Sequence, residues 1–200
     1  MEHPTIFVDP SDRPVIATAE DALLAKQATV AAGYYVDPFL EYFARNPVRM
    51  VQPIIKRGTL ARVACIDRAV VSFAKLHSHH SCQVVVLGAG LDTTYLRTAA
   101  GLLDDMPSSI PAWFEVDHPS VVLSKAKTMT KHASQMKVTV VIAGTDCCVS
   151  SDTSKCQCIG HDLRVPPSQL MEKLTRKGFN VEVPTLFLLE CVQMYLPGKS

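Results

Sequence analysis

The first part of the chain carries apolar side chains at helical spacing. Residues 20–32 (EDALLAKQATVAA) are rich in Ala and Leu and end at Gly33, and residues 60–76 (LARVACIDRAVVSFAKL) place apolar residues on one helical face, which predicts two helices. A shorter helix is expected over 38–44, because a proline there suits a first helical turn. Residues 1–14 and 45–58 are interrupted by prolines and are predicted to be mostly loop.

The pattern changes after residue 80 to short apolar runs that alternate with helical segments. The predicted strands are 83–87 (QVVVL), 112–116 (AWFEV), 137–143 (KVTVVIA) and 184–189 (PTLFLL). The predicted helices are 93–103, 119–131 and 168–177, and a polar loop is predicted over 145–160. Strands that alternate with helices indicate an α/β fold with a doubly wound sheet.

These two patterns predict one domain with two parts. Residues 1–80 are expected to form an N-terminal helical cap, and 81–200 a Rossmann-like core. The chain stops just past the fourth predicted strand, so we expect a sheet that is incomplete at its C-terminus. An unpaired strand edge with an apolar face would favour association with other chains. We also expect the 200 residues alone to be a weakly active protein.

Composition and charge exclude several kinds of partner. The 200 residues are 48% hydrophobic and 20% charged, as in an ordinary globular domain, and the formal net charge is +1. A nearly neutral chain lacks the basic field that nucleic-acid binding requires. Neither a membrane-spanning stretch nor the apolar segment of a signal peptide is recognisable, so we expect a cytoplasmic protein without membrane contact.

The seven cysteines do not indicate a disulfide framework, because their number is odd and no secretion signal is present. Four of them lie close together in the sequence with a histidine: Cys147, Cys148, Cys156, Cys158 and His161. Zinc ligands are usually paired as C-x-x-C or wider, whereas these pairs are C-C and C-x-C. We therefore predict no metal site and interpret the segment as a polar loop that contains thiols.

The segment VVVLGAGLDTT, residues 84–94, has the glycines of a ligand-binding turn. Gly88 and Gly90 follow a predicted strand, where glycines allow a tight turn and the close approach of a ligand. A dinucleotide fingerprint would have a third glycine where Thr93 stands. Asp92 would oppose a phosphate but suits a positive centre such as the sulfonium of S-adenosylmethionine. The loop thus favours a methyl donor over a nucleotide, unless Asp92 simply caps the next helix.

Acidic residues follow three further predicted strands or their loops. Asp117 could accept hydrogen bonds from both ribose hydroxyls of an adenosyl ligand, or it could cap the following helix. Asp162 and Leu163 could contact an adenine ring, although Asp162 and Arg164 could instead be an ordinary surface pair. Glu190 directly follows the last predicted strand, at the sheet edge where open α/β folds bind ligands. We expect these acids and the glycine loop to converge on one cleft.

Six segments together resemble the leucine carboxyl methyltransferase family, in the family's order over nearly the whole chain. They are DALLAKQATVAAGYYVDPF (21–39), KRGTLARV (56–63), VVVLGAGLDTTYLR (84–97), WFEVDHPSVVLSKA (113–126), IGHDLR (159–164) and PTLFLLECVQMYL (184–196). The resemblance implies a Rossmann-like methyltransferase that uses S-adenosylmethionine. It also implies an acceptor, the C-terminal leucine carboxylate in the tail of type 2A protein phosphatase catalytic subunits.

The resemblance also implies roles for individual residues. Arg62 would grip the methionine carboxylate of the donor and Lys26 would line the same place, although the pattern alone suggests solvated side chains at both positions. The remaining implied contacts are the glycine loop at Gly88 and Gly90, the ribose acid Asp117, the adenine contacts Asp162 and Leu163, and the strand-end acid Glu190. Two aromatic residues that the family usually has after R-G are replaced here by Thr59 and Leu60, and the family continues beyond residue 200. Both departures concern the acceptor side more than the donor side.

No catalytic acid or base is expected for this reaction. A carboxylate acceptor is already a nucleophile at neutral pH, so catalysis would depend mainly on alignment in a dry pocket. Two alternatives stay open at this point. The chain could be a related methyltransferase that acts on a modified tRNA base or a small carboxylic acid, or a non-catalytic module that binds the donor or the phosphatase.

Overall fold

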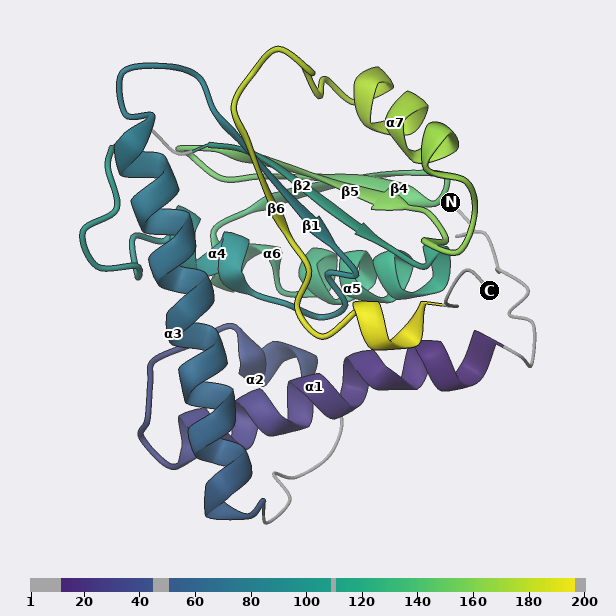
Figure 1. Ribbon diagram of the computed structural model, residues 1–200. Coiled ribbons are helices and arrows are strands. Elements are labelled where there is room, and N and C mark those ends of the chain that lie inside the picture. The colour runs from purple at the N-terminus through teal and green to yellow at the C-terminus, as the bar shows by residue number, and fades with distance from the viewer. Residues whose placement is uncertain (1–11, 45–50, 109–110, 197–200) are drawn as a thin grey trace.

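The computed structural model describes residues 12–44, 51–108 and 111–196. The described chain begins with three helices. They are α1 (Arg13–Ala31), α2 (Leu40–Phe43) and α3 (Pro53–Leu76) (Figure 1). The prediction of loop was wrong at Arg13 and for the part of 45–58 that begins at Pro53. Prolines in a first turn do not interrupt a helix, because the N–H groups there have no partner within the helix. Residues 1–11 and 45–50 lie outside the described residues.

The rest of the described chain forms one six-stranded sheet and the helices that pack on it, which confirms the predicted α/β, Rossmann-like class. The strands are β1 (Gln83–Leu87), β2 (Ala112–Asp117), β3 (Thr139–Ala143), β4 (Asp146–Ser150), β5 (Lys155–Gly160) and β6 (Thr185–Leu188). The helices are α4 (Thr94–Ala99), α5 (Pro119–Lys131), α6 (Ala133–Met136) and α7 (Pro167–Arg176), with a 3-10 turn η2 (Gln193–Tyr195) near the end. The strand order is β3-β4-β5-β2-β1-β6, and the pairs β5–β2, β2–β1 and β1–β6 are parallel.

The segment 145–160, which was predicted to be a polar loop, instead forms two strands. β4 is antiparallel to both β3 and β5, and β5 pairs with β2 in the parallel part of the sheet. Alternate residues of these strands are buried, namely Cys147, Val149, Cys156 and Cys158. The prediction failed because it counted thiols as polar, whereas buried cysteines pack as small hydrophobic residues and here restore the period of two.

Helices cover both faces of the sheet (Figure 1). On one face, Leu174 of α7 packs with Phe114, Val116 and other residues of the sheet. On the other face lie α4, α5 and α6, with α1 and α2 beyond them, and there residues of the cap and the sheet share one apolar cluster. The division at residue 80 stays a prediction. The two parts contact each other through this shared apolar cluster. None of the described helices is both long and apolar enough to cross a membrane.

The outer edge of β6 has no strand partner among the residues described. Phe187 in β6 and Leu189 just after it are 47% and 48% exposed. The inner edge of β6 pairs with β1, and the chain then turns towards the glycine loop through η2. This path brings the residues after β6 to the same place as the loops after β1 and β2.

Candidate functional site

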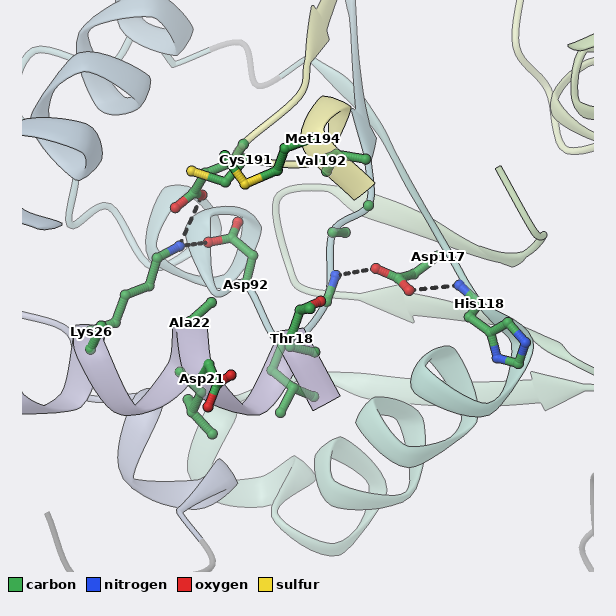
Figure 2. Close-up of a pocket in the computed structure, with 18 of the residues that line it drawn as sticks. Thr18, Asp21, Ala22, Lys26, Asp92, Asp117, His118, Cys191, Val192 and Met194 are labelled. Carbon is green, nitrogen blue, oxygen red and sulfur yellow. Dashed lines mark hydrogen bonds and ion pairs between the residues drawn. The ribbon is translucent and has the colours of Figure 1, made fainter. Parts of the chain in front are cut away.

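A cavity of about 390 Å³ lies at the carboxyl ends of the parallel strands. Its walls come from α1, the first half of α3, the loops after β1, β2 and β5, and the segment after β6. Figure 2 shows α1 on one side of this space and Val192 and Met194 on the other. All of the site residues predicted from the sequence line it: Lys26, Arg62, Gly88, Gly90, Asp117, Asp162, Leu163 and Glu190. The fold thus brings these side chains together, while their contacts to a ligand stay a prediction.

The glycine loop is shaped by two residues with positive φ. Gly88 and Gly90 have φ angles of +70° and +54°, in the region that residues with a Cβ rarely adopt. A Cβ on Gly88 would lie 2.3 Å from Cγ2 of Val192, so the segment after β6 packs directly on the loop. The loop and the segment after β6 therefore form one wall of the cavity.

This packing predicts a measurable difference between two glycine substitutions. We expect Gly88→Ala to lower the free energy of unfolding by about 1–2 kcal/mol more than Gly33→Ala, the cost of forcing a methyl group into a filled space. Gly33 is a matched control, because its φ of +74° is similar but no atom lies within 4 Å of an added Cβ. Chemical denaturation measures both values. Equal destabilisation by the two substitutions would contradict the contact with Val192.

Asp117 is held at the end of β2 by two backbone donors. Its Oδ2 accepts a hydrogen bond from the Gly90 N–H at 2.6 Å, and its Oδ1 accepts one from the His118 N–H at 2.6 Å. Burial raises the pKa of Asp117, and these two hydrogen bonds oppose that rise. Each carboxylate oxygen can still accept a second hydrogen bond. The capping alternative does not apply to Asp117, because the His118 ring caps α5 by accepting from the Ser120 N–H.

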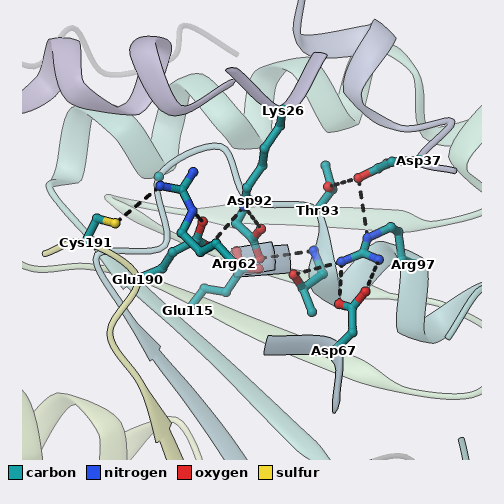
Figure 3. A network of polar contacts seen from close by, with 12 residues as sticks. Lys26, Asp37, Arg62, Asp67, Asp92, Thr93, Arg97, Glu115, Glu190 and Cys191 are labelled. Carbon is teal, nitrogen blue, oxygen red and sulfur yellow. Dashed lines mark hydrogen bonds and ion pairs between the residues drawn. The ribbon is translucent and has the colours of Figure 1, made fainter. Parts of the chain in front are cut away.

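Four charged side chains of alternating sign close the cavity beside the cap helices (Figure 3). The Lys26 ammonium on α1 donates to Asp92 Oδ1 at 2.7 Å and to Glu190 Oε2 at 3.0 Å. Arg62 Nε on α3 lies 2.7 Å from Glu190 Oε1, although the two atoms are not in hydrogen-bond geometry. Asp92 Oδ2 also accepts from the Thr94 N–H at 3.1 Å, so this residue contacts the first turn of α4, whose N-cap is Thr93, as well as pairing with the lysine.

The charges in this network support one another. Burial works to raise the pKa of Asp92, but the ammonium groups of Lys26 and Lys125 outweigh it and hold that pKa below its usual value. Burial likewise works to lower the pKa of Lys26, and the carboxylates of Asp92 and Glu190 reverse that effect. Both groups are therefore charged at neutral pH despite being largely shielded from water.

The adenine-side residues lie in the loop after β5. Asp162 accepts from Arg164 Nε at 2.9 Å and Nη2 at 2.7 Å, and Arg164 also pairs with Asp12. The hydrogen bonds from Arg164 lower the pKa of Asp162. The surface pair considered from the sequence is thus present, at the rim of the cavity, with Asp162 and Arg164 side chains 31% and 32% exposed.

Some lining residues could not be found from the sequence patterns. Thr18 lies in the first turns of α1, which were predicted to precede the helix. Val192 and Met194 follow β6 without any regular pattern, so only the turn of the chain places them here. The one signal for His118 in the sequence is its position next to Asp117, the predicted ribose acid.

The group of thiols near β5 is a different feature from this cavity. Glu115, Cys156 and Cys158 are buried, and their ligand-type atoms lie within 4.8 Å of one another. The Lys125 ammonium lies 2.5 Å from Glu115 Oε2, so a positive charge of the chain itself already neighbours this group. We assign no metal to it.

Comparison with known proteins identifies consistent relatives. The family model described as leucine carboxyl methyltransferase matches residues 3–200. Leucine carboxyl methyltransferase 1 of Rattus norvegicus is 33% identical over 197 residues, which cover 96% of this chain and 57% of the relative. The protein of the same name in Bos taurus is 30% identical over 196 residues, with coverages of 96% and 57%. The Arabidopsis thaliana homolog is 30% identical over 191 residues, with coverages of 93% and 54%. The chain spans a little over half the length of these curated relatives.

Proposed function

Since the chain belongs to the leucine carboxyl methyltransferase family, we propose that its cavity binds S-adenosylmethionine for methyl transfer to a carboxylate. One observation carries this proposal. A single cavity combines a neutral network of two carboxylates and two cations with the half-buried carboxylate of Asp117 at the end of β2, on the two sides of a glycine loop. The two polar regions match the amino-acid end and the ribose of the donor.

The network suits a ligand that carries both an ammonium and a carboxylate. Lys26, Asp92, Glu190 and Arg62 sum to zero charge, so a zwitterionic group can replace internal pairs without adding net charge to a shielded place. Arg62 Nε and Glu190 Oε1 make no hydrogen bond among the described residues, although both atoms are buried. The two atoms already form an ion pair 2.7 Å apart, and a ligand carboxylate and ammonium would give each of them a hydrogen-bonded partner as well.

The other region suits the nucleoside part of the donor. Asp117 stands beside Gly90, and its two oxygens can each accept a hydroxyl hydrogen bond in addition to the backbone N–H they already hold. Leu163 would pack against the adenine ring, with Asp162 at the rim. A dinucleotide fingerprint would have a third glycine where Thr93 stands, and the Asp92 carboxylate would repel a pyrophosphate.

In the proposed reaction the residues of the chain bind, orient and exclude water. The donor supplies a methyl group on a positively charged sulfur, and an acceptor carboxylate attacks that carbon. Opposite charges disappear as the ester and the thioether form, and a dry, weakly polar pocket favours such a reaction. No proton is transferred, so no general acid or base is required of the chain. Alignment of the two reactants would be the main contribution.

Titration calorimetry with the unaltered chain tests donor binding. We expect heat of binding with S-adenosylmethionine and with its demethylated product, S-adenosylhomocysteine, and none with NAD at the same concentrations. The reason is the carboxylate of Asp92, which favours a positive centre and opposes a phosphate. Binding of NAD without any response to the methyl donor would contradict the proposal.

We further propose that the acceptor is the C-terminal leucine carboxylate of a type 2A protein phosphatase catalytic subunit. The test is transfer of a labelled methyl group to a peptide that ends as the phosphatase tail does. A peptide with the same sequence and a C-terminal amide is the control, because it lacks the nucleophilic carboxylate. Labelling of both peptides, or of a small carboxylic acid in preference to the tail, would reject this acceptor while leaving donor binding intact.

A further inference from the structure

The charged network continues inward beyond the cavity. The Lys125 ammonium on α5 donates to the main-chain oxygen of Asp92 at 2.5 Å and to Glu115 Oε2 at 2.5 Å. Lys125 and Glu115 are 3% and 4% exposed, and neither lines the cavity. Charges of alternating sign thus run from the middle of the sheet to the cap in the order Glu115, Lys125, Asp92, Lys26, Glu190, Arg62.

The inner pair is not explained by stability alone. Removing two charges from water costs several kcal/mol per ion, and apolar residues of similar volume often replace a buried pair without loss of stability. Burial raises the pKa of Glu115, although the ammonium of Lys125 opposes that rise. The short distance between Lys125 Nζ and Glu115 Oε2 is that of a charge-assisted hydrogen bond. Such a pair is better accounted for by what it holds in place.

What Lys125 holds is the backbone of Asp92. The main-chain oxygen of Asp92 accepts from Lys125, while its N–H donates to the Ala89 oxygen at 2.9 Å. The Asp92 carboxylate is held separately, by Lys26 and by the N–H of Thr94. The contact with Lys26 belongs to the outer network, which the proposed ligand would rearrange. The contact with Lys125 does not, because Lys125 does not line the cavity.

We propose that Lys125, held by Glu115, is a positioning residue that keeps Asp92 in place while the outer pairs exchange for the amino-acid group of the donor. This inference rests on the proposed binding of the donor in the cavity. Lys125 is also the second of the two ammonium groups that keep Asp92 charged, so it remains as a counter-charge when Lys26 turns to a ligand carboxylate. The nucleoside end of the donor would lie at Asp117, whose hydrogen bonds come from Gly90 and His118, and it should depend on Lys125 much less.

The experiment compares two ligands and a charge-free pair. Lys125→Met alone would leave the Glu115 carboxylate buried without a partner, so the variant is Glu115→Gln combined with Lys125→Met, which keeps the side-chain volumes and removes both charges. Its ligands are S-adenosylhomocysteine and 5′-methylthioadenosine, which shares the adenosyl part but lacks the amino-acid group. The control variant is Lys127→Met, two positions along α5, where the side chain is exposed. A cooperative unfolding transition of the double variant establishes that it is folded.

We expect the double variant to bind S-adenosylhomocysteine about tenfold more weakly than the unaltered chain, the lower end of what loss of a hydrogen bond to a charged group produces. Its affinity for 5′-methylthioadenosine should stay within about twofold, since that ligand does not use the network. Glu115→Gln alone, which keeps the ammonium but loosens its hold, should show a smaller loss of the same kind. Lys127→Met should change neither affinity.

The outcomes separate the inference from the function on which it rests. Equal weakening of both ligands would mean general damage to the site and would overturn the positioning role, and so would unchanged affinity for S-adenosylhomocysteine. Failure of the unaltered chain to bind S-adenosylhomocysteine would remove the proposed function itself, and the inference with it. A selective loss in the double variant supports both.

Discussion

Replacing Arg97 by methionine is expected to lower the free energy of unfolding by about 3–5 kcal/mol, the cost of removing one partner from a buried ion pair. The Arg97 guanidinium donates to both carboxylate oxygens of Asp67 at 2.8 and 2.7 Å, and its Nε lies 3.4 Å from Asp37 Oδ2 (Figure 3). The side chains of Arg97 and Asp37 are 5% and 1% exposed. The substitution would leave the Asp37 carboxylate shielded from water with no cation beside it.

Chemical denaturation of the purified chain gives the measurement, and Lys75→Met is the control. Lys75 pairs with Asp105 at 3.3 Å, but their side chains are 50% and 80% exposed. Exposed pairs contribute less than about 1 kcal/mol, because water screens them and ordering two long side chains costs entropy. If Arg97→Met were no more destabilising than Lys75→Met, the tie between α4, α3 and the segment around Asp37 would not hold the fold together as described.

The largest loss of ligand affinity is expected from Asp117→Ala. We expect it to weaken S-adenosylhomocysteine by about 1–3 kcal/mol, because the ligand hydroxyls would lose their charged acceptor. The same loss should apply to 5′-methylthioadenosine, which distinguishes this substitution from the change at Lys125. Asp117→Asn keeps one carbonyl acceptor, so its affinity for S-adenosylhomocysteine should lie between that of the unaltered chain and that of Asp117→Ala.

Titration calorimetry measures these affinities, with Asp152→Ala as the control. Asp152 is exposed in the turn between β4 and β5 and does not line the cavity. Asp117 also accepts from the Gly90 N–H, so unfolding is measured alongside to separate loss of the ligand contact from loss of the loop. Undiminished affinity in a folded Asp117→Ala protein would remove Asp117 from the donor site.

The sequence predicted elements best where local chemistry alone decides the backbone. The bounds of β1 and α5 agree with the predicted ranges, because a β-branched run ends at Gly88 and Pro119 starts a first turn. It failed over 145–160, since whether a cysteine is polar or apolar depends on its burial, which only the neighbouring strands determine.

The candidate site divides in the same way. The acids after the strands could be predicted because parallel strands end at one edge of a sheet. Arg62 and Lys26 could be placed only through the family resemblance, since a cation on a helix looks the same whether solvated or paired. Lys125 was missed, although α5 itself was found, because its partners Glu115 and Asp92 come from a strand and a loop that only tertiary packing brings to it.

The contact between Lys26 and Glu190 also sets when the cavity can exist during synthesis. The two residues are 164 positions apart, so we expect this contact, which closes a long loop, to form late in folding. A growing polypeptide that has not yet released β6 from the ribosome lacks both Glu190 and the Val192 side chain that rests on the glycine loop. The strands β1, β2 and β5 can pair before that moment, but the cavity cannot yet form. S-adenosylmethionine added to stalled nascent chains should therefore bind, and so protect from proteolysis, only those chains in which residue 192 has emerged from the ribosome.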